Sequence, residues 1–291
     1  MTQQDPFRAP LAYENPRFLN SADGRILRIM AEYQEPLARF RRERIQDTVV
    51  FFGSARFHSQ EDATGALQLL EKPYSATPAP IEEQEKIRLA RAAVEMAKYY
   101  EDARRLAYML TEWNMAIGGK RHRFVVTTGG GPGIMEAANR GASEAGGKTV
   151  GLNIKLPFEQ MPNKYITPEL NFEFHYFFMR KLWFAYLAKA LIVFPGGFGT
   201  FDELFEILTL AQTEKLAKKI TVLMYGSDYW NKVINFQALV DAGVIAPDDA
   251  KLFHLVDTPE EGFDCLKENL VRDHLGPHHP ERAPEIAKTR R

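Results

Sequence analysis

Short apolar runs alternate with longer helical stretches through most of this 291-residue chain, and this alternation limits its folds more than any other feature. The runs are rich in Val, Ile, Leu and Phe, as strands buried on both faces are. Parallel strands need a helical crossover between them, whereas hairpin strands need only a tight turn. We therefore expect an α/β fold: a doubly wound, mostly parallel sheet of about seven strands with helices on both faces. The strands are expected at residues 49–52, 124–127, 149–154, 172–177, 191–194, 220–224 and 252–256.

The chain divides into three expected parts. Residues 1–46 form an N-terminal arm and helix, residues 47–271 form the α/β domain, and residues 272–291 form a disordered tail. We expect residues 58–80 to form an inserted loop, because they show little apolar periodicity. The helices are expected at residues 23–44, 81–117, 134–145, 179–189, from 200 onwards, 228–242 and after 258.

Composition and charge exclude several classes of protein. The chain is 45% hydrophobic and 26% charged, as ordinary soluble proteins are. A formal net charge of −1 argues against a nucleic-acid partner. No run approaches the ~18 apolar residues of a membrane span, and no signal pattern is seen, so we expect a cytoplasmic protein without a membrane partner. The single cysteine, Cys265, excludes an internal disulfide and a Cys-based zinc site, and no histidine pair has metal-binding spacing, so we expect no metal.

Three of the expected strands lead into glycine-rich turns, each followed by a helix or a cation. Glycines allow backbone N–H groups to approach a ligand, and a helix start favours an anion. Ligands of parallel sheets bind beyond the carboxyl ends of the strands, where these turns meet. The turns therefore predict a phosphate or nucleotide site; the alternative is that the glycines serve only tight turns and helix caps. The candidate binding residues are Gly53, Ser54, Arg56, Gly130, Gly131, Gly133, Gly196, Gly197, Gly199 and Thr200.

Two familiar nucleotide motifs do not fit these turns. The segment 141–149 resembles a Walker loop, but its spacing is one residue too long and it leaves a helix to enter a strand. Neither large glycine turn satisfies G-x-G-x-x-G, and the third strand ends at Asn153 without the acid that holds a ribose. NAD is therefore disfavoured, and we expect no cofactor.

Arg180 and Glu203 are the candidate catalytic residues. One helix and one strand separate them, so both side chains can reach the same crevice at the sheet edge. Each also has a simpler interpretation. The segment 200–203 is a capping box in which Glu203 would only bond back to the helix start, and Arg180 and Lys181 could form a solvated helix face.

Two neighbouring segments add weaker candidates. Glu159 lies on a proline-rich loop, and such loops carry function more often than core residues do. Aromatic residues gather between 172 and 183, where they could form core or a surface that stacks on a base.

The chain resembles the Lonely Guy (LOG) family, whose members are often labelled lysine decarboxylases. Residues 195–203 match its P-G-G-x-G-T-x-x-E signature, residues 129–135 its second glycine motif, and residues 179–181 its Arg-Lys motif. The resemblance covers roughly residues 47–270 and implies a Rossmann-like, nucleotide-binding catalytic domain in a homodimer. It implies hydrolysis of nucleoside 5′-monophosphates, AMP or cytokinin riboside monophosphates among them, to free base and ribose 5-phosphate. By position, Arg180 and Glu203 would be catalytic, and Lys181, Thr209 and residues 197–203 would bind substrate.

Two other functions stay open. The same glycine turns could serve a carrier that binds a nucleotide or the molybdenum cofactor without turnover, and the terminal extensions could recruit a protein partner. The Arg180–Glu203 pair favours the hydrolase. We find no cofactor-lysine motif, so decarboxylation is not expected.

Overall fold

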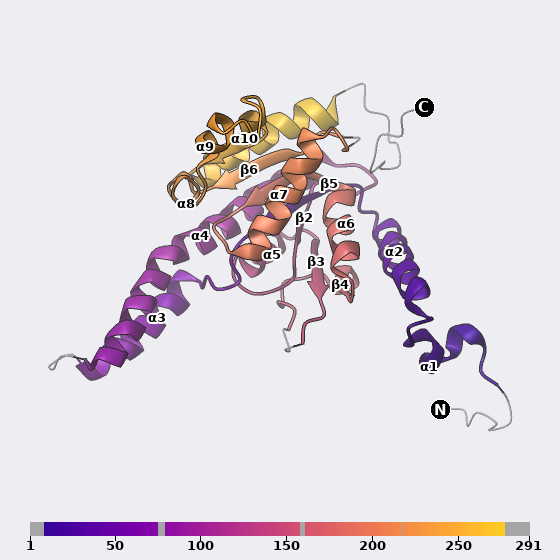
Figure 1. Cartoon of the computed structure of the whole chain (residues 1–291), viewed down its shortest axis with the longest axis horizontal. Coiled ribbons are helices and arrows are strands. Elements are labelled where there is room, and N and C mark those ends of the chain that lie inside the picture. Colours follow the sequence, from indigo (N-terminus) through magenta and orange to yellow (C-terminus); the bar gives the residue numbers. More distant parts are fainter. Residues whose placement is uncertain (1–8, 75–78, 158–160, 217, 277–291) are drawn as a thin grey trace.

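The computed structural model describes residues 9–74, 79–157, 161–216 and 218–276, and its centre is one parallel sheet (Figure 1). Within these ranges the sheet has seven strands in the order β4-β3-β2-β1-β5-β6-β7, and every neighbouring pair is parallel. The α/β prediction is therefore confirmed. The strands are β1 (Thr48–Phe52), β2 (Val125–Thr128), β3 (Thr149–Ile154), β4 (Asn171–Phe174), β5 (Ala188–Val193), β6 (Thr221–Tyr225) and β7 (His254–Val256).

The chain changes direction across the sheet once. From β1 it winds outward to β4, then returns to the other side of β1 with β5 and continues to β7. The point of reversal lies between β1 and β5, which pair directly. In open α/β sheets the crevice beyond the strand ends at such a point is where ligands bind.

Helices cover both faces of the sheet. On β1, Val49 and Phe51 pack with α4, α5 and α10, whereas Val50 and Phe52 face the layer that includes α2, α6 and α7. Successive strand residues point to opposite faces, so this alternation makes β1 buried on both sides. The helices are α1 (Pro16–Leu19), α2 (Arg25–Arg42), α3 (Gln60–Glu71), α4 (Ile81–Ile117), α5 (Ile134–Glu144), α6 (Phe177–Leu187), α7 (Phe198–Gln212), α8 (Ser227–Val233), α9 (Phe236–Asp241) and α10 (Pro259–Leu270).

The region expected as an inserted loop contains α3, so that prediction was wrong. Ser59 caps this helix by accepting the N–H of Asp62, and it packs against α4. With 37 residues, α4 is about 55 Å long at 1.5 Å per residue. Its first half and α3 project from the sheet as a helical arm (Figure 1).

Other boundaries also differ from expectation. The helix expected over residues 228–242 is two helices, α8 and α9, and the N-terminal arm includes α1. The expected tail begins within a π-helical turn, Val271–Leu275, and residues 277–291 lie outside the described ranges. In the described part of the chain, no helix combines the length and apolar character needed to cross a membrane.

Candidate functional site

The turns after β1, β2 and β5 contact one another at the point of reversal. The backbone N–H of Ser54 donates to the carbonyl of Pro195 at 3.0 Å, and the carbonyl of Ser54 accepts from the N–H of Ile134 at 3.1 Å. Ser54 therefore joins the turn after β1 to both of the larger glycine turns. The three turns predicted to share a site do come together.

Two glycines in the turn after β2 have backbone conformations that other residues rarely adopt. Gly130 has φ +76° and Gly133 has φ +71°. A Cβ on Gly130 would overlap the side chain of Asn153, and one on Gly133 would overlap the carbonyl of Ser54. These positions thus need glycine both for the turn and for the close approach.

A buried polar network supports this same turn, and the sequence analysis did not assign it. Asn139 accepts the hydroxyl of Thr128 at 2.6 Å and the amide of Asn163 at 2.9 Å. The Asn163 side chain also donates to the carbonyls of Gly130 and Gly131, each at 3.1 Å. Two signals in the sequence point to it: Asn163 on the proline-rich loop, and a polar residue, Asn139, on the otherwise apolar face of α5.

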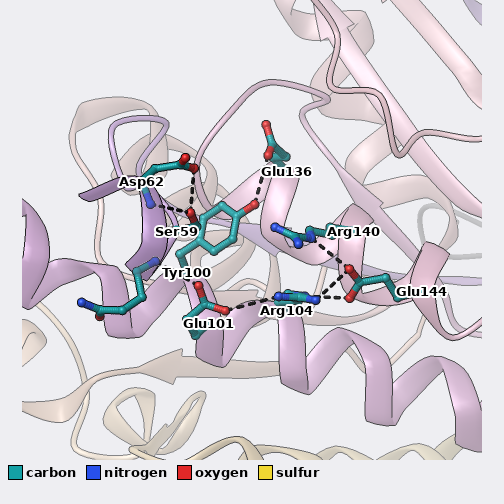
Figure 2. Close-up of polar contacts among 9 residues, drawn as sticks. Ser59, Asp62, Tyr100, Glu101, Arg104, Glu136, Arg140 and Glu144 are labelled. Carbon is teal, nitrogen blue, oxygen red and sulfur yellow. Dashed lines mark hydrogen bonds and ion pairs between the residues drawn. The ribbon is translucent and has the colours of Figure 1, made fainter. Parts of the chain in front are cut away.

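The helix that follows the turn is fastened to α4 by the contacts in Figure 2. Tyr100 donates to the carboxylate of Glu136, in the first turn of α5, at 3.0 Å. Farther along, Arg104 and Arg140 both pair with Glu144, at 2.7 and 2.9 Å. The glycine turn therefore rests on a helix that the base of the arm holds in place.

The helix after β5 begins earlier than expected. Its N-cap is Gly197, not Thr200, and Thr200 N–H already donates to the Gly197 carbonyl at 2.9 Å. The capping-box interpretation of Glu203 is therefore wrong, because Glu203 lies in the second turn of α7. The amides of Phe198 and Gly199 lie in the first turn, where no helical carbonyl can accept them. They are available to an anion.

Arg180 enters the site from α6. Its Nε donates to the carbonyl of Leu152 at 2.7 Å, and its guanidinium lies against Gly129, where an added Cβ would overlap it. Burial lowers the pKa of Arg180, and the nearby Glu203 carboxylate opposes this effect. The side chain is thus a fixed, largely desolvated cation at the carboxyl ends of β2 and β3.

Glu203 is the buried acid of the site, with a relative exposure of 7%. Burial raises its pKa from 4.5 to about 7, although the charges of Arg180 and Lys181 act to lower it. Within the described ranges, Glu203 forms no ion pair at 4.0 Å or less with either cation. A carboxyl near half-ionised at neutral pH can act as a base, as an acid or as a negative charge beside a developing cation.

Lys181 is placed differently from Arg180. It pairs with Asp202 at 2.7 Å and Glu206 at 3.2 Å, both on α7. Burial acts to lower its pKa, but these two hydrogen bonds raise it overall. Lys181 therefore connects α6 to α7.

The remaining candidates lie at the rim of the site or outside the described residues. Arg56 is exposed, and its backbone N–H donates to the Ser54 hydroxyl at 3.1 Å. Thr209 is exposed and donates to the Phe205 carbonyl of its own helix at 2.7 Å. Glu159 falls outside the described ranges. Across those ranges, no group of three or more His, Cys, Asp or Glu side chains could hold a metal ion.

Comparisons with known proteins agree with this arrangement. The family model "Possible lysine decarboxylase" matches residues 135–266, which include Arg180 and Glu203. A cytokinin riboside 5′-monophosphate phosphoribohydrolase of Arabidopsis thaliana is 30% identical over 165 residues, covering 52% of this chain and 74% of that protein. The chain belongs to the LOG family.

Other LOG-family relatives are similarly distant. A probable phosphoribohydrolase of the same name from Oryza sativa subsp. japonica is 28% identical, over 50% of this chain and 68% of that protein. Among solved structures, a molybdenum cofactor carrier protein from Chlamydomonas reinhardtii has 19% identity and a TM-score of 0.39, covering 60% of this chain and 89% of that one.

Proposed function

We propose that this LOG-family protein hydrolyses the N-glycosidic bond of nucleoside 5′-monophosphates, AMP or a cytokinin riboside monophosphate, to free base and ribose 5-phosphate. The observation that carries the proposal is Glu203, a buried acid near the half-buried cation Arg180 at the point where the sheet reverses. Relatives named as phosphoribohydrolases support hydrolysis at the level of the family.

The 5′-phosphate would bind to main-chain amides. The first turn of α7 and the glycine turn before α5 both supply N–H groups, and both helix starts favour negative charge. Phosphate binding at these turns would leave the ribose over the crevice, with its anomeric carbon near Glu203. Arg180 would contact the phosphate or polarise the leaving base.

In the reaction, the C1′–N bond breaks and positive charge develops on the ribose. The Glu203 carboxylate stabilises this charge and accepts a proton from the attacking water. The water oxygen forms the new bond to C1′, the departing nitrogen of the base takes up a proton from solvent, and Glu203 later returns its proton to solvent, so that the net change is addition of one water. Ionised Glu203 is needed for this role, and its pKa of about 7 leaves a substantial fraction ionised at neutral pH.

The direct test is base release from AMP, followed by chromatography. Removing one electrostatic contact of this type costs ~10²–10³ in rate, so we expect Glu203→Ala and Arg180→Ala to abolish detectable turnover while the protein stays folded. Glu35→Gln, at an exposed position on α2 outside the candidate set, is the control and should keep its turnover. Nucleotide binding by calorimetry without base release from any nucleoside monophosphate would instead identify a carrier.

We also propose that the protein acts as a homodimer. The aromatic cluster around α6 is divided: Phe172, Phe174 and Trp183 are buried, whereas Phe177 and Phe178 are each 55% exposed. Such an exposed apolar group beside a site is typical of a subunit contact. Light scattering during gel filtration tests this, and a monomer at micromolar concentration would contradict it.

A further inference from the structure

The N-terminal helix α2 holds the start of α6, the helix that carries Arg180. The Glu32 carboxylate accepts the backbone N–H of His175 at 2.7 Å through Oε1 and that of Tyr176 at 3.3 Å through Oε2. These two residues directly precede α6, where amides have no helical acceptor. A half-buried carboxylate from a distant segment thus caps the helix.

A proline in α2 gives Glu32 a second contact with α6. Pro36 has no N–H, so the carbonyl of Glu32, four residues earlier, lacks its usual helical donor. That carbonyl accepts the indole N–H of Trp183 at 2.9 Å instead. Glu32 therefore holds α6 at two places. Its carboxylate accepts the two amides just before the helix, and its carbonyl accepts the Trp183 indole two turns later.

These contacts lie on the stripe of α6 that carries Arg180. Tyr176, Arg180 and Trp183 are spaced at i, i+4 and i+7, so they line one side of the helix. Arg28 donates to the hydroxyl of Tyr176 at 3.3 Å, and the Tyr33 and Trp183 rings lie 5.8 Å apart. On the other flank, Lys181 connects α6 to α7. The contacts of α2 thus hold the first two turns of α6, which carry Arg180.

We propose that Glu32 is a positioning residue: by fixing the start of α6, it sets where the Arg180 guanidinium lies relative to the glycine turn and Glu203. This inference deepens the proposed function and rests on it, since Arg180 acts there on the substrate. It gives the N-terminal helix, which precedes the α/β domain, a part in the reaction.

The test compares Glu32→Gln with Glu35→Gln, an exposed position on the same helix that pairs with Arg39. Glutamine keeps the length but has one acceptor oxygen, so at least one of the two amides loses its partner. A displacement of about 1 Å can cost ~10² in rate, so we expect kcat for AMP cleavage to fall ten- to a hundredfold in Glu32→Gln. Glu35→Gln should stay within about twofold of the wild type.

A second measurement separates positioning from simple loss of stability. The charged groups that act on Glu203 are Arg180 and Lys181 from α6 and Asp202 and Glu206 from α7. Withdrawal of Arg180 removes a charge that lowers the Glu203 pKa, so the carboxyl should titrate at higher pH in Glu32→Gln. Carbon-13 NMR of labelled glutamate measures this without substrate.

The titration also keeps this inference distinct from the proposed function. If the wild type releases no base, the proposed function fails, but the Glu203 titration still tests the position of Arg180. An unchanged titration in Glu32→Gln, or an equal change in Glu35→Gln, overturns the inference. If Glu32→Gln does not fold, Tyr176→Phe removes the hydroxyl that accepts from Arg28 on α2 and keeps the ring, and the same shift should appear at smaller size.

Discussion

The buried acid of the site should make the protein less stable as pH rises through neutrality. Glu203 is 7% exposed, and burial raises its pKa from 4.5 to about 7. At about 1.4 kcal/mol per pH unit, this corresponds to about 3 kcal/mol. Between the two values the folded protein holds the proton more tightly than the unfolded chain does. The contribution of Glu203 to the free energy of unfolding is therefore largest below pH 4.5. It falls as pH rises, and above pH 7 it is fully lost.

Glu203→Gln should remove that loss. The glutamine amide has nearly the same shape as the carboxyl and does not ionise. The free energy of unfolding of Glu203→Gln, relative to the wild type, should therefore rise by about 2–3 kcal/mol between pH 5 and pH 8. Comparing the two pH values cancels the cost of burying the amide, which does not titrate. Urea unfolding at each pH gives the free energies. The same variant should lose turnover, because the reaction needs the ionised Glu203 carboxylate that lowers stability.

The control for this prediction is Asp264→Asn, which removes an exposed acid from α10 that is not among the charges acting on Glu203. Its stability relative to the wild type should change by less than 1 kcal/mol over the same range. An equal free-energy difference between Glu203→Gln and the wild type at pH 5 and pH 8 would refute the reasoning, because it would mean that Glu203 titrates alike in the folded and unfolded chain.

Three further predictions follow from the site. In a pH profile, kcat/KM for base release should fall about tenfold per pH unit below pH 7, because Glu203 must be ionised; a flat profile from pH 5.5 to 8 contradicts this. Gly130→Ala should destabilise the protein more than Gly146→Ala in urea unfolding. Both glycines have positive φ, but only a Cβ on Gly130 would overlap Asn153. Equal effects would show that the overlap is relieved. Tyr229→Phe removes the donor to the glycine-turn carbonyl after β5 and should cost ~1 kcal/mol of stability, whereas an unchanged unfolding midpoint would show that another donor replaces it.

The sequence predicted the strands well because each is a short apolar run buried on both faces. It could not give their order, which depends on which sheet edge each crossover reaches. The helix α3 was missed although Ser59 and Asp62 form a capping pattern, because it packs chiefly against α4 and so leaves a weak apolar period. The start of α7 was misplaced because Thr200 resembles an N-cap, whereas Gly197 has that role.

The site was predictable as far as local patterns define it. Glycine turns after strands locate the crevice, and the spacing of Arg180 and Glu203 places both near it. The supporting contacts were not predictable, because Asn163 and Glu32 bond to groups that any sequence offers, main-chain amides and carbonyls. Burial of Glu203, which raises its pKa, likewise depends on tertiary packing that no local pattern shows.

The contact between Glu32 and His175 joins segments 143 residues apart, and this has a consequence during synthesis. At about 5–20 residues per second, α2 leaves the ribosome roughly 7 to 30 seconds before its docking surface exists. During that interval Tyr33 and Phe40 have no partner to cover them. A nascent chain that stalls before α6 would therefore present a bare amphipathic helix to chaperones and proteases, whereas a chain that completes α6 can cover it at once.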